Sequence, residues 1–190
     1  MAKQNKQSLI LKVRAMFDQD GGVEERPVTV GNKNISIFYV DSLIDKKLFA
    51  DSILSPIEQL SKQALKTDDV VEDISKVVSV SGMTQTQDEK EIVTKILSGS
   101  AVVVTETEAV ICPIFGLQAR SVTEPPTSRV VKGPREGFVE DLPKNLGLIR
   151  KRLKTPNLKI KEVCVGRQSQ TSVSIVWLDG IAKPEIVDEV

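Results

Sequence analysis

The segment VVKGPREGFVEDL, at residues 130–142, brings together residue types that could bind a charged ligand. Gly133 and Gly137 permit backbone angles that other residues resist, and Pro134 stiffens the turn between them. The sequence therefore predicts a rigid loop, and these three residues are also the expected hinge points of any movement nearby.

The loop would present the side chains of Arg135 and Glu136, and its backbone N–H groups could hold an anion. Such an arrangement suits a ligand site or a protein interface. The alternative is a fixed turn in which Arg135 and Glu136 pair with neighbouring charges. The residues themselves leave both interpretations open.

The composition excludes much of the chemistry that enzymes use. The chain has no histidine, which removes histidine-based acid–base catalysis, His-containing triads and His-ligated zinc. Neither of the phosphate-binding patterns GxxxxGKS/T and GxGxxG occurs. Cys112 and Cys164 lack the spacing of a metal site and are interpreted as buried thiols in a reducing compartment. We therefore expect no catalytic residues, no metal ligands, no cofactor and no enzymatic activity.

Charge is unevenly distributed along a chain whose net charge is zero. Residues 41–91 hold eleven acidic and six basic residues, whereas residues 129–161 hold ten basic and three acidic ones. This asymmetry is typical of two solvated faces, but it also fits attraction between two lobes or an acidic partner for the second half. A nucleic-acid partner is not expected, because aromatic residues make up only 4% of the chain.

Apolar periodicity and capping residues predict an alternation of helices and strands. We expect Leu48, Phe49 and Ile53 to face inward from one helix, and Ile186 and Val187 from the last. The expected helices lie at 8–17, 45–54 and 56–65 and begin again at Thr67, Asp88, Asp141 and Pro184. The expected strands are 35–40, 101–104 and 109–114, followed by a hairpin of 158–165 and 172–178.

Two stretches resemble one another at an offset of 138 residues, ISIFYVDSLIDKKLFADSI and VSIVWLDGIAKPEIVDEV. Each reads as a strand, a turn that begins with aspartate, and a helix. A true repeat would place Asp41 and Asp179 at equivalent ends of two sheets, where open α/β sheets bind ligands. The alternative is that any strand–turn–helix segment produces such a likeness.

The run EPPTSRVVKGPREGFVEDLPKNLGLIRKRLKTPNLKIKEVCVGRQSQTSVSIVWLDGIA resembles the A-subunit family of spore germination receptors (GerA type). The family pattern is close to EPxTExVVRGPREGFTExxxTNxxLIRxRIKxPxLK, and the likeness extends from about residue 119 to 190. YVDSLIDKKLFADSILSPIEQL and ILSG resemble the same family more loosely. The chain departs from the pattern at four positions, Ser128, Lys132, Val139 and Pro143.

The resemblance implies an α/β fold with two small α/β subdomains that have mixed sheets and are separated by a cleft. We expect the first at residues 1–120 and the second at 121–190, with the chain truncated before a C-terminal membrane region. The full-length protein would be embedded in the inner spore membrane, with this domain soluble on the cytoplasmic (spore core) side. Its implied partners are the receptor B and C subunits and a small nutrient germinant, an amino acid or sugar. Homo-oligomeric assembly is compatible with such a receptor.

The first functional hypothesis is that the domain senses or relays germinants through the cleft. The expected polar lining is Arg135, Glu136, Glu140 and Asn145, with Asp41 and Asp179 as further candidates. Arginine could hold a carboxylate, and an acidic side chain could take an ammonium group. The hinge residues would be Gly133, Pro134 and Gly137.

The second hypothesis is an assembly scaffold that does not bind the nutrient. The basic residues Arg150, Lys151, Arg152 and Lys154 would then contact another subunit or anionic lipid headgroups. The location of the 130–142 motif separates the hypotheses: a position in a cleft favours sensing, and a flat exposed surface favours the scaffold.

Overall fold

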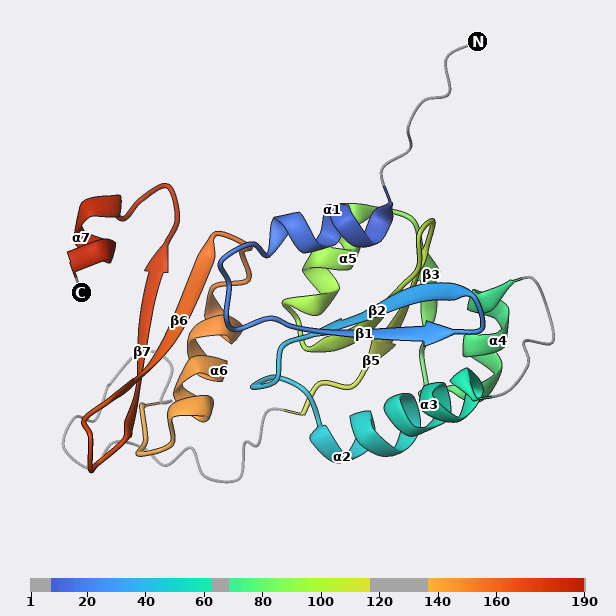
Figure 1. Ribbon diagram of the computed structural model, residues 1–190, viewed down its shortest axis with the longest axis horizontal. Coiled ribbons are helices and arrows are strands. Elements are labelled where there is room, and N and C mark those ends of the chain that lie inside the picture. The colour runs from blue at the N-terminus through green and yellow to red at the C-terminus, as the bar shows by residue number, and fades with distance from the viewer. Residues whose placement is uncertain (1–7, 63–68, 117–136, 190) are drawn as a thin grey trace, which may run out of the picture.

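The structure is a computed structural model that describes residues 8–62, 69–116 and 137–189. It contains one five-stranded sheet and one two-stranded sheet (Figure 1). We call residues 8–116, which build the five-stranded sheet, the first unit, and residues 137–189 the second unit. The predicted boundary between residues 120 and 121 lies outside the described residues and stays a prediction.

The strands of the first unit are ordered β1-β2-β4-β5-β3, and every neighbouring pair is antiparallel. Their bounds are β1 Glu24–Val30, β2 Lys33–Tyr39, β3 Thr84–Thr86, β4 Ser100–Val104 and β5 Ala109–Pro113. The sequence did not reveal β1 or β3, because both are mostly exposed edge strands without apolar alternation. Pro27 in β1 is compatible with this position, since an edge strand can lack one ladder donor.

Helices cover both faces of the five-stranded sheet (Figure 1). On β2, Ile35 and Ile37 pack with α2, α3 and α4, whereas Phe38 packs with α1 and α5, as does Val40 directly after the strand. Burial on both faces explains why β4 and β5 read as continuous apolar runs. The helices are α1 Leu9–Met16, α2 Lys46–Phe49, α3 Ser55–Ser61, α4 Val70–Val77 and α5 Glu89–Ile96.

The helix that follows β2 is continuous from α2 to α3 through a π-helical turn, Ala50–Leu54, where a restart at Pro56 was expected. Proline donates no hydrogen bond and its ring crowds the carbonyl four residues earlier. The carbonyl in question is that of Ser52, four residues before Pro56, and it accepts a hydrogen bond from the backbone N–H of Ser79 at 3.2 Å. Phe49 and Ile53 are buried as predicted, but Leu48 is 38% exposed because it lies beside the buried stripe.

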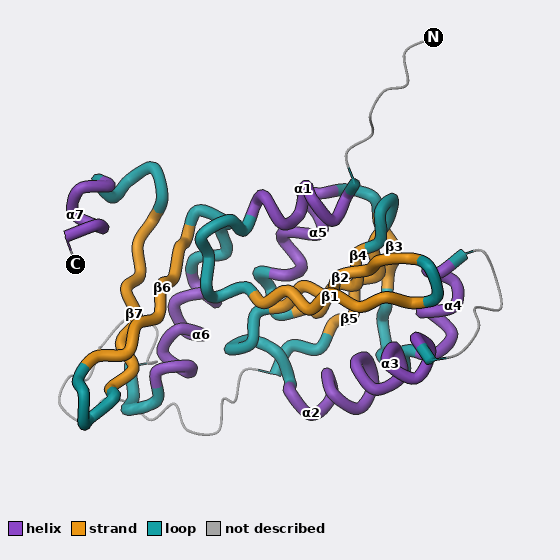
Figure 2. Tube along the Cα trace, in the orientation of Figure 1, coloured by secondary structure: helices purple, strands orange, loops and turns teal. Residues whose placement is uncertain are grey.

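The second unit consists of α6 Leu142–Arg152, the β6–β7 hairpin and α7 Pro184–Glu189. The strands β6 Leu158–Val165 and β7 Thr171–Leu178 pair antiparallel over their whole length, which confirms the hairpin. Figure 2 shows the hairpin as a separate pair of strands beside the first unit. The inward face expected for the last helix is wrong, since Ile186 is 58% exposed and no described residue of α7 is buried.

The fold is mixed α/β, but the expected mixed sheets are wrong because both sheets are purely antiparallel. Tight turns join β1 to β2, β4 to β5 and β6 to β7, and a tight turn can only return the chain antiparallel.

Thr67, the residue expected to begin the next helix, lies outside the described residues. The α4 helix is capped by Asp69, whose carboxylate accepts a hydrogen bond from Val71 N–H at 3.0 Å. Asp88 and Asp141 cap α5 and α6 as predicted. No helix among the described residues is long and apolar enough to cross a membrane.

Candidate functional site

A cleft of about 540 Å³ lies between the two units, where the loop after β2 faces the N-terminus of α6. Its volume is in the range of small-molecule sites. The residues that line it are Asp41, Ser42, Ile44, Asp45, Lys46, Lys47, Gly116, Asp141, Pro143 and Lys144. Six of these ten residues carry a charged side chain, so the cleft is suited to a polar ligand.

The wall from the first unit is held rigidly by backbone hydrogen bonds. Asp45 N–H donates to Ile114 C=O at 2.8 Å, and the Asp45 carboxylate accepts from Leu48 N–H at 2.9 Å, which caps α2. A Cβ at Gly116 would lie 2.5 Å from Asp45 Cα, so only glycine fits at that position. On this fixed wall, Lys46 Nζ pairs with Asp41 Oδ2 at 2.6 Å, and both side chains are exposed.

The wall from the second unit is the first turn of α6. The Asp141 carboxylate accepts from Lys144 N–H at 3.2 Å, and its Oδ2 pairs with Lys144 Nζ at 2.9 Å. These hydrogen bonds from Lys144 lower the pKa of Asp141 below the ordinary aspartate value of 3.8. Each wall therefore presents one lysine–aspartate pair whose side chains are at least 32% exposed.

Either lysine–aspartate pair can separate and bind a ligand instead at little cost in free energy. Exposed ion pairs contribute only about 0–1 kcal/mol, because water competes for both charges. A ligand carboxylate could accept hydrogen bonds from lysine, and a ligand ammonium group or hydroxyl could donate to aspartate. The cleft therefore has the chemistry to bind a small molecule that carries both kinds of group.

Of the six predicted lining residues, Asp41 lies in the cleft. Arg135 and Glu136 fall outside the described residues, and the other three are not among the residues that line the cleft. Asp179 lines a separate depression of about 430 Å³, formed with the end of α1 and the start of β6. Asn145 is tied to the main chain of Val139, donating to its C=O at 2.7 Å and accepting from its N–H at 2.9 Å. Glu140 is exposed and is absent from the residues that form the cleft wall.

Four predicted residues, Gly133, Pro134, Arg135 and Glu136, lie outside the described residues. Gly137 is described and is half-buried where the second unit begins. The roles proposed for these five positions stay predictions.

Arg150 does not belong to the expected basic surface, because its side chain is 0% exposed and so is unavailable to another subunit or a lipid headgroup. Lys151, Arg152 and Lys154 are exposed. The expectation of two buried thiols is also half correct, because Cys112 is buried and Cys164 is exposed. Burial raises the pKa of the Cys112 thiol to about 12.

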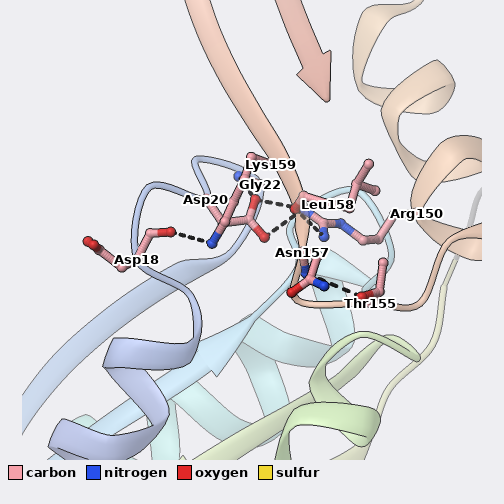
Figure 3. Close-up of polar contacts among 8 residues, drawn as sticks. All are labelled: Asp18, Asp20, Gly22, Arg150, Thr155, Asn157, Leu158 and Lys159. Carbon is pink, nitrogen blue, oxygen red and sulfur yellow. Dashed lines mark hydrogen bonds and ion pairs between the residues drawn. The ribbon is translucent and has the colours of Figure 1, made fainter. Parts of the chain in front are cut away.

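Sequence reasoning missed the ion pair of Asp20 and Arg150, which helps to join the two units (Figure 3). The segment that contains Asp20 reads only as a loop that ends a helix. A signal was nevertheless present, since Arg150 lies four residues after the buried Leu146 and therefore on the same face of α6. Among the described residues, no group of three or more Cys, Asp or Glu is arranged to hold a metal ion.

Comparison with known proteins gives one family match and a set of relatives. The family model described as Bacillus/Clostridium GerA spore germination protein matches residues 11–190. Spore germination protein GerQA of Bacillus cereus is 31% identical over 166 residues, covering 86% of this chain and 32% of the relative. Spore germination protein KA of Bacillus subtilis (strain 168) is 25% identical over 170 residues, covering 87% of this chain and 31% of the relative. The chain thus spans about a third of the length of these relatives.

The fold resembles a crystal structure of the N-terminal domain of the A subunit of the Bacillus megaterium spore germinant receptor GerK3. The TM-score is 0.69 with 18% sequence identity, and the match covers 95% of this chain and 67% of that chain. At this identity the likeness is one of fold.

Proposed function

The chain belongs to the GerA spore germination family, and on this premise we propose that it is the N-terminal domain of a germinant receptor A subunit that senses or relays a small-molecule germinant. The observation that carries the proposal is the charged cleft between the units. One wall is fixed to the five-stranded sheet and the other is the first turn of α6. A ligand that touches both walls would favour one relative position of the units, which is how binding becomes a signal.

The proposed ligand is an amino acid or a sugar. A free amino acid could place its carboxylate near Lys46 or Lys144 and its ammonium group near Asp41 or Asp141. Sugar hydroxyls could use the same side chains as donors and acceptors. Gly133, Pro134 and Gly137 remain the proposed hinge residues.

Relatives such as GerQA and KA are spore germination proteins, which also supports a proposal for the whole protein. We place the full-length protein in the inner spore membrane with receptor B and C subunits, and this domain on the spore-core side. Its role there is that of a receptor domain without catalytic residues.

A second candidate function is a scaffold that contacts another subunit or anionic lipid headgroups. It is favoured by the exposed side chains of Lys151, Arg152 and Lys154, which follow the buried part of α6. Arg150 takes no part in this surface, because its side chain is fully buried.

The proposed function is tested by an NMR titration of the 190-residue chain with amino acids, sugars and salts. We expect saturable amide shifts in residues 41–47 and 141–144 for at least one ligand. Lys144→Gln should weaken that binding by about tenfold, as expected for the loss of one charge-assisted hydrogen bond of about 1.5 kcal/mol.

The matched control is Lys76→Gln, which removes an exposed lysine from an ion pair with Glu72 of 2.7 Å, outside the cleft. This variant should bind as the unaltered chain does. A folded chain that shows no shift with any ligand would place the nutrient site in another subunit. Shifts confined to residues 151–154 on adding anionic vesicles would favour the scaffold instead.

A further inference from the structure

The loop between α1 and β1, residues 18–22, contacts the end of α6 and the start of β6 and so joins the two units (Figure 3). Asp141 caps the N-terminus of α6, and Arg150 lies in its last turn. With a rise of about 1.5 Å per residue, the cleft and this junction are about 14 Å apart along α6. The helix thus connects the two places directly.

The centre of the junction is a buried ion pair. Arg150 Nη2 donates to Asp20 Oδ1 at 2.7 Å and to Oδ2 at 2.8 Å, and both side chains have 0% exposure. Arg150 Nη1 donates to Leu158 C=O at 3.1 Å, and Asp20 Oδ1 also accepts from Gly22 N–H at 3.0 Å. Arg150 Nε has no hydrogen-bond partner among the described residues, so the contact depends on the two terminal nitrogens.

The backbones of the two units also approach closely here. Gly21 N–H donates to Ile160 C=O at 2.9 Å, and Lys159 Nζ donates to Asp18 C=O. A Cβ at Gly21 would lie 2.8 Å from the Ile160 carbonyl oxygen, and one at Gly22 would lie 2.8 Å from Arg150 Nη2. A side chain at either position would force a neighbouring group to shift, so these two glycines allow the units to approach this closely.

The cleft end of the same helix is held differently. The pair of Lys46 and Asp41 lies within the first unit, and the pair of Lys144 and Asp141 lies within the second. All four side chains are at least 32% exposed. Within the described residues, the polar contacts identified between the units converge on the loop 18–22.

Separating the buried pair would leave each charge without water, whereas neither of the two ion pairs at the cleft has to separate when the units rotate, because each lies within one unit. We propose that the Asp20–Arg150 junction is a fixed pivot between the units, and that α6 is a lever whose N-terminus moves at the cleft when the units rotate. The purpose of the motion, to open and close a germinant cleft, rests on the proposed function. The pivot itself is a property of the ligand-free chain.

The pivot can be tested by distance measurements between pairs of spin labels with pulsed EPR. Cys164 is exposed and supplies one label in the second unit, whereas Cys112 is buried with a pKa of about 12 and stays unlabelled. The partner label is placed at Ala15→Cys, in the last turn of α1 near the junction, or at Asp51→Cys, in the π-helical turn of the helix that begins at the cleft.

Rotation about a pivot leaves distances from the pivot to the moving unit unchanged. We therefore expect a narrow distance distribution between labels at positions 15 and 164, and a broader one between labels at positions 51 and 164. Gly22→Ala, whose added methyl group overlaps Arg150, should broaden the first distribution as well. Arg150→Met should do the same if the variant folds.

Because Arg150→Met leaves a buried aspartate without its partner, it is paired with the charge-free double variant Asp20→Leu with Arg150→Met. The matched control is Arg26→Met, which breaks an ion pair of 2.7 Å with Glu58 inside the first unit and should leave both distributions unchanged.

The pivot is overturned if the two distributions are equally broad in the unaltered chain. It is also overturned if Gly22→Ala and the double variant, both shown by circular dichroism to be folded, keep the first distribution narrow. Neither measurement includes a ligand, so failure of the pivot leaves the germinant cleft standing. A ligand titration without shifts would likewise leave the pivot standing.

Discussion

At the scale of single residues, Asp141 shows how one carboxylate can serve both structure and recognition. It caps α6 by accepting from Lys144 N–H, and it pairs with Lys144 Nζ at the edge of the cleft. A ligand that attracts either side chain would therefore act on the start of the helix. The departure from the family pattern at Pro143 is compatible with this role, since proline fits the first turn of a helix.

The titration of Asp141 is the prediction that belongs to this scale. Hydrogen bonds from Lys144 lower its pKa in the folded chain, so the charged form is favoured and the contact stabilises the fold above the unfolded pKa. That stabilisation is lost as the pH falls through the lowered folded pKa. NMR of the Asp141 carboxyl carbon should give a midpoint below 3.8, and Lys144→Gln should move it back towards 3.8. A midpoint at or above 3.8 in the folded chain would contradict the assignment.

Arg150 illustrates how neighbours of the same charge can differ in role. Arg150, Lys151 and Arg152 form one basic run in sequence, yet Arg150 is buried and the other two are exposed. Successive residues of a helix point in directions about 100° apart, so only one of the three can face Leu146 and the core. Whether that residue meets aspartate or water depends on a loop 130 positions away.

At the scale of elements, the helix that runs from α2 to α3 depends on the burial of a few side chains. Ile53 lies in the π-helical turn and is 0% exposed, whereas Leu48, one turn earlier, is 38% exposed. Removing methyl groups from a packed core lowers stability, because transfer free energy is lost and a cavity is left behind. Removing them from an exposed side chain lowers stability little.

Ile53→Ala should therefore lower the free energy of unfolding by about 2–5 kcal/mol, and Leu48→Ala by less than about 1 kcal/mol. Urea denaturation followed by circular dichroism measures both values. Equal losses would show that the buried face of this helix is assigned incorrectly.

At the scale of the whole molecule, the two units differ in how their sheets are covered. Helices pack on both faces of the five-stranded sheet, and all five residues of β4 are buried. In the hairpin, the outer half of β6 and all of β7 are half-buried or exposed. Regions with few buried contacts open locally at lower free energy.

Amide hydrogen exchange should separate the units accordingly. Amides of β4 should exchange only through global unfolding, and those of β7 faster by about tenfold or more, which corresponds to about 1.4 kcal/mol in opening free energy. Exchange measured by NMR residue by residue gives the comparison. Equal protection of the two strands would show that the hairpin is covered as well as the central sheet.

Local features were predictable from the sequence because their causes are local. The aspartate caps at Asp88 and Asp141 and the β6–β7 hairpin follow from capping groups and apolar alternation, which act over a few residues. The edge strand β1 was missed for the same reason, since its charged and proline-containing sequence has no local pattern and pairs only because β2 is beside it.

The candidate site divides in the same way. The sequence pointed to Asp41 and to the segment that leads into α6, and the structure brings Asp41 and Asp141 to one cleft. The sequence could not show that Asp179 lines a different depression or that Asn145 is hydrogen-bonded to the backbone of Val139. The first outcome depends on how the two units are placed, and the second on how the backbone at residue 139 folds against α6 within the second unit.

By itself, the sequence determined the family, most of the elements and the absence of histidine chemistry, because these depend on residue identity and near neighbours. Only the tertiary structure decided which charges are buried and which face the cleft. Asp20 and Arg150 are 130 positions apart, and their attraction becomes strong only where folding removes water from both of them. The environment of a charge is a property of the folded chain, so no local pattern contains it.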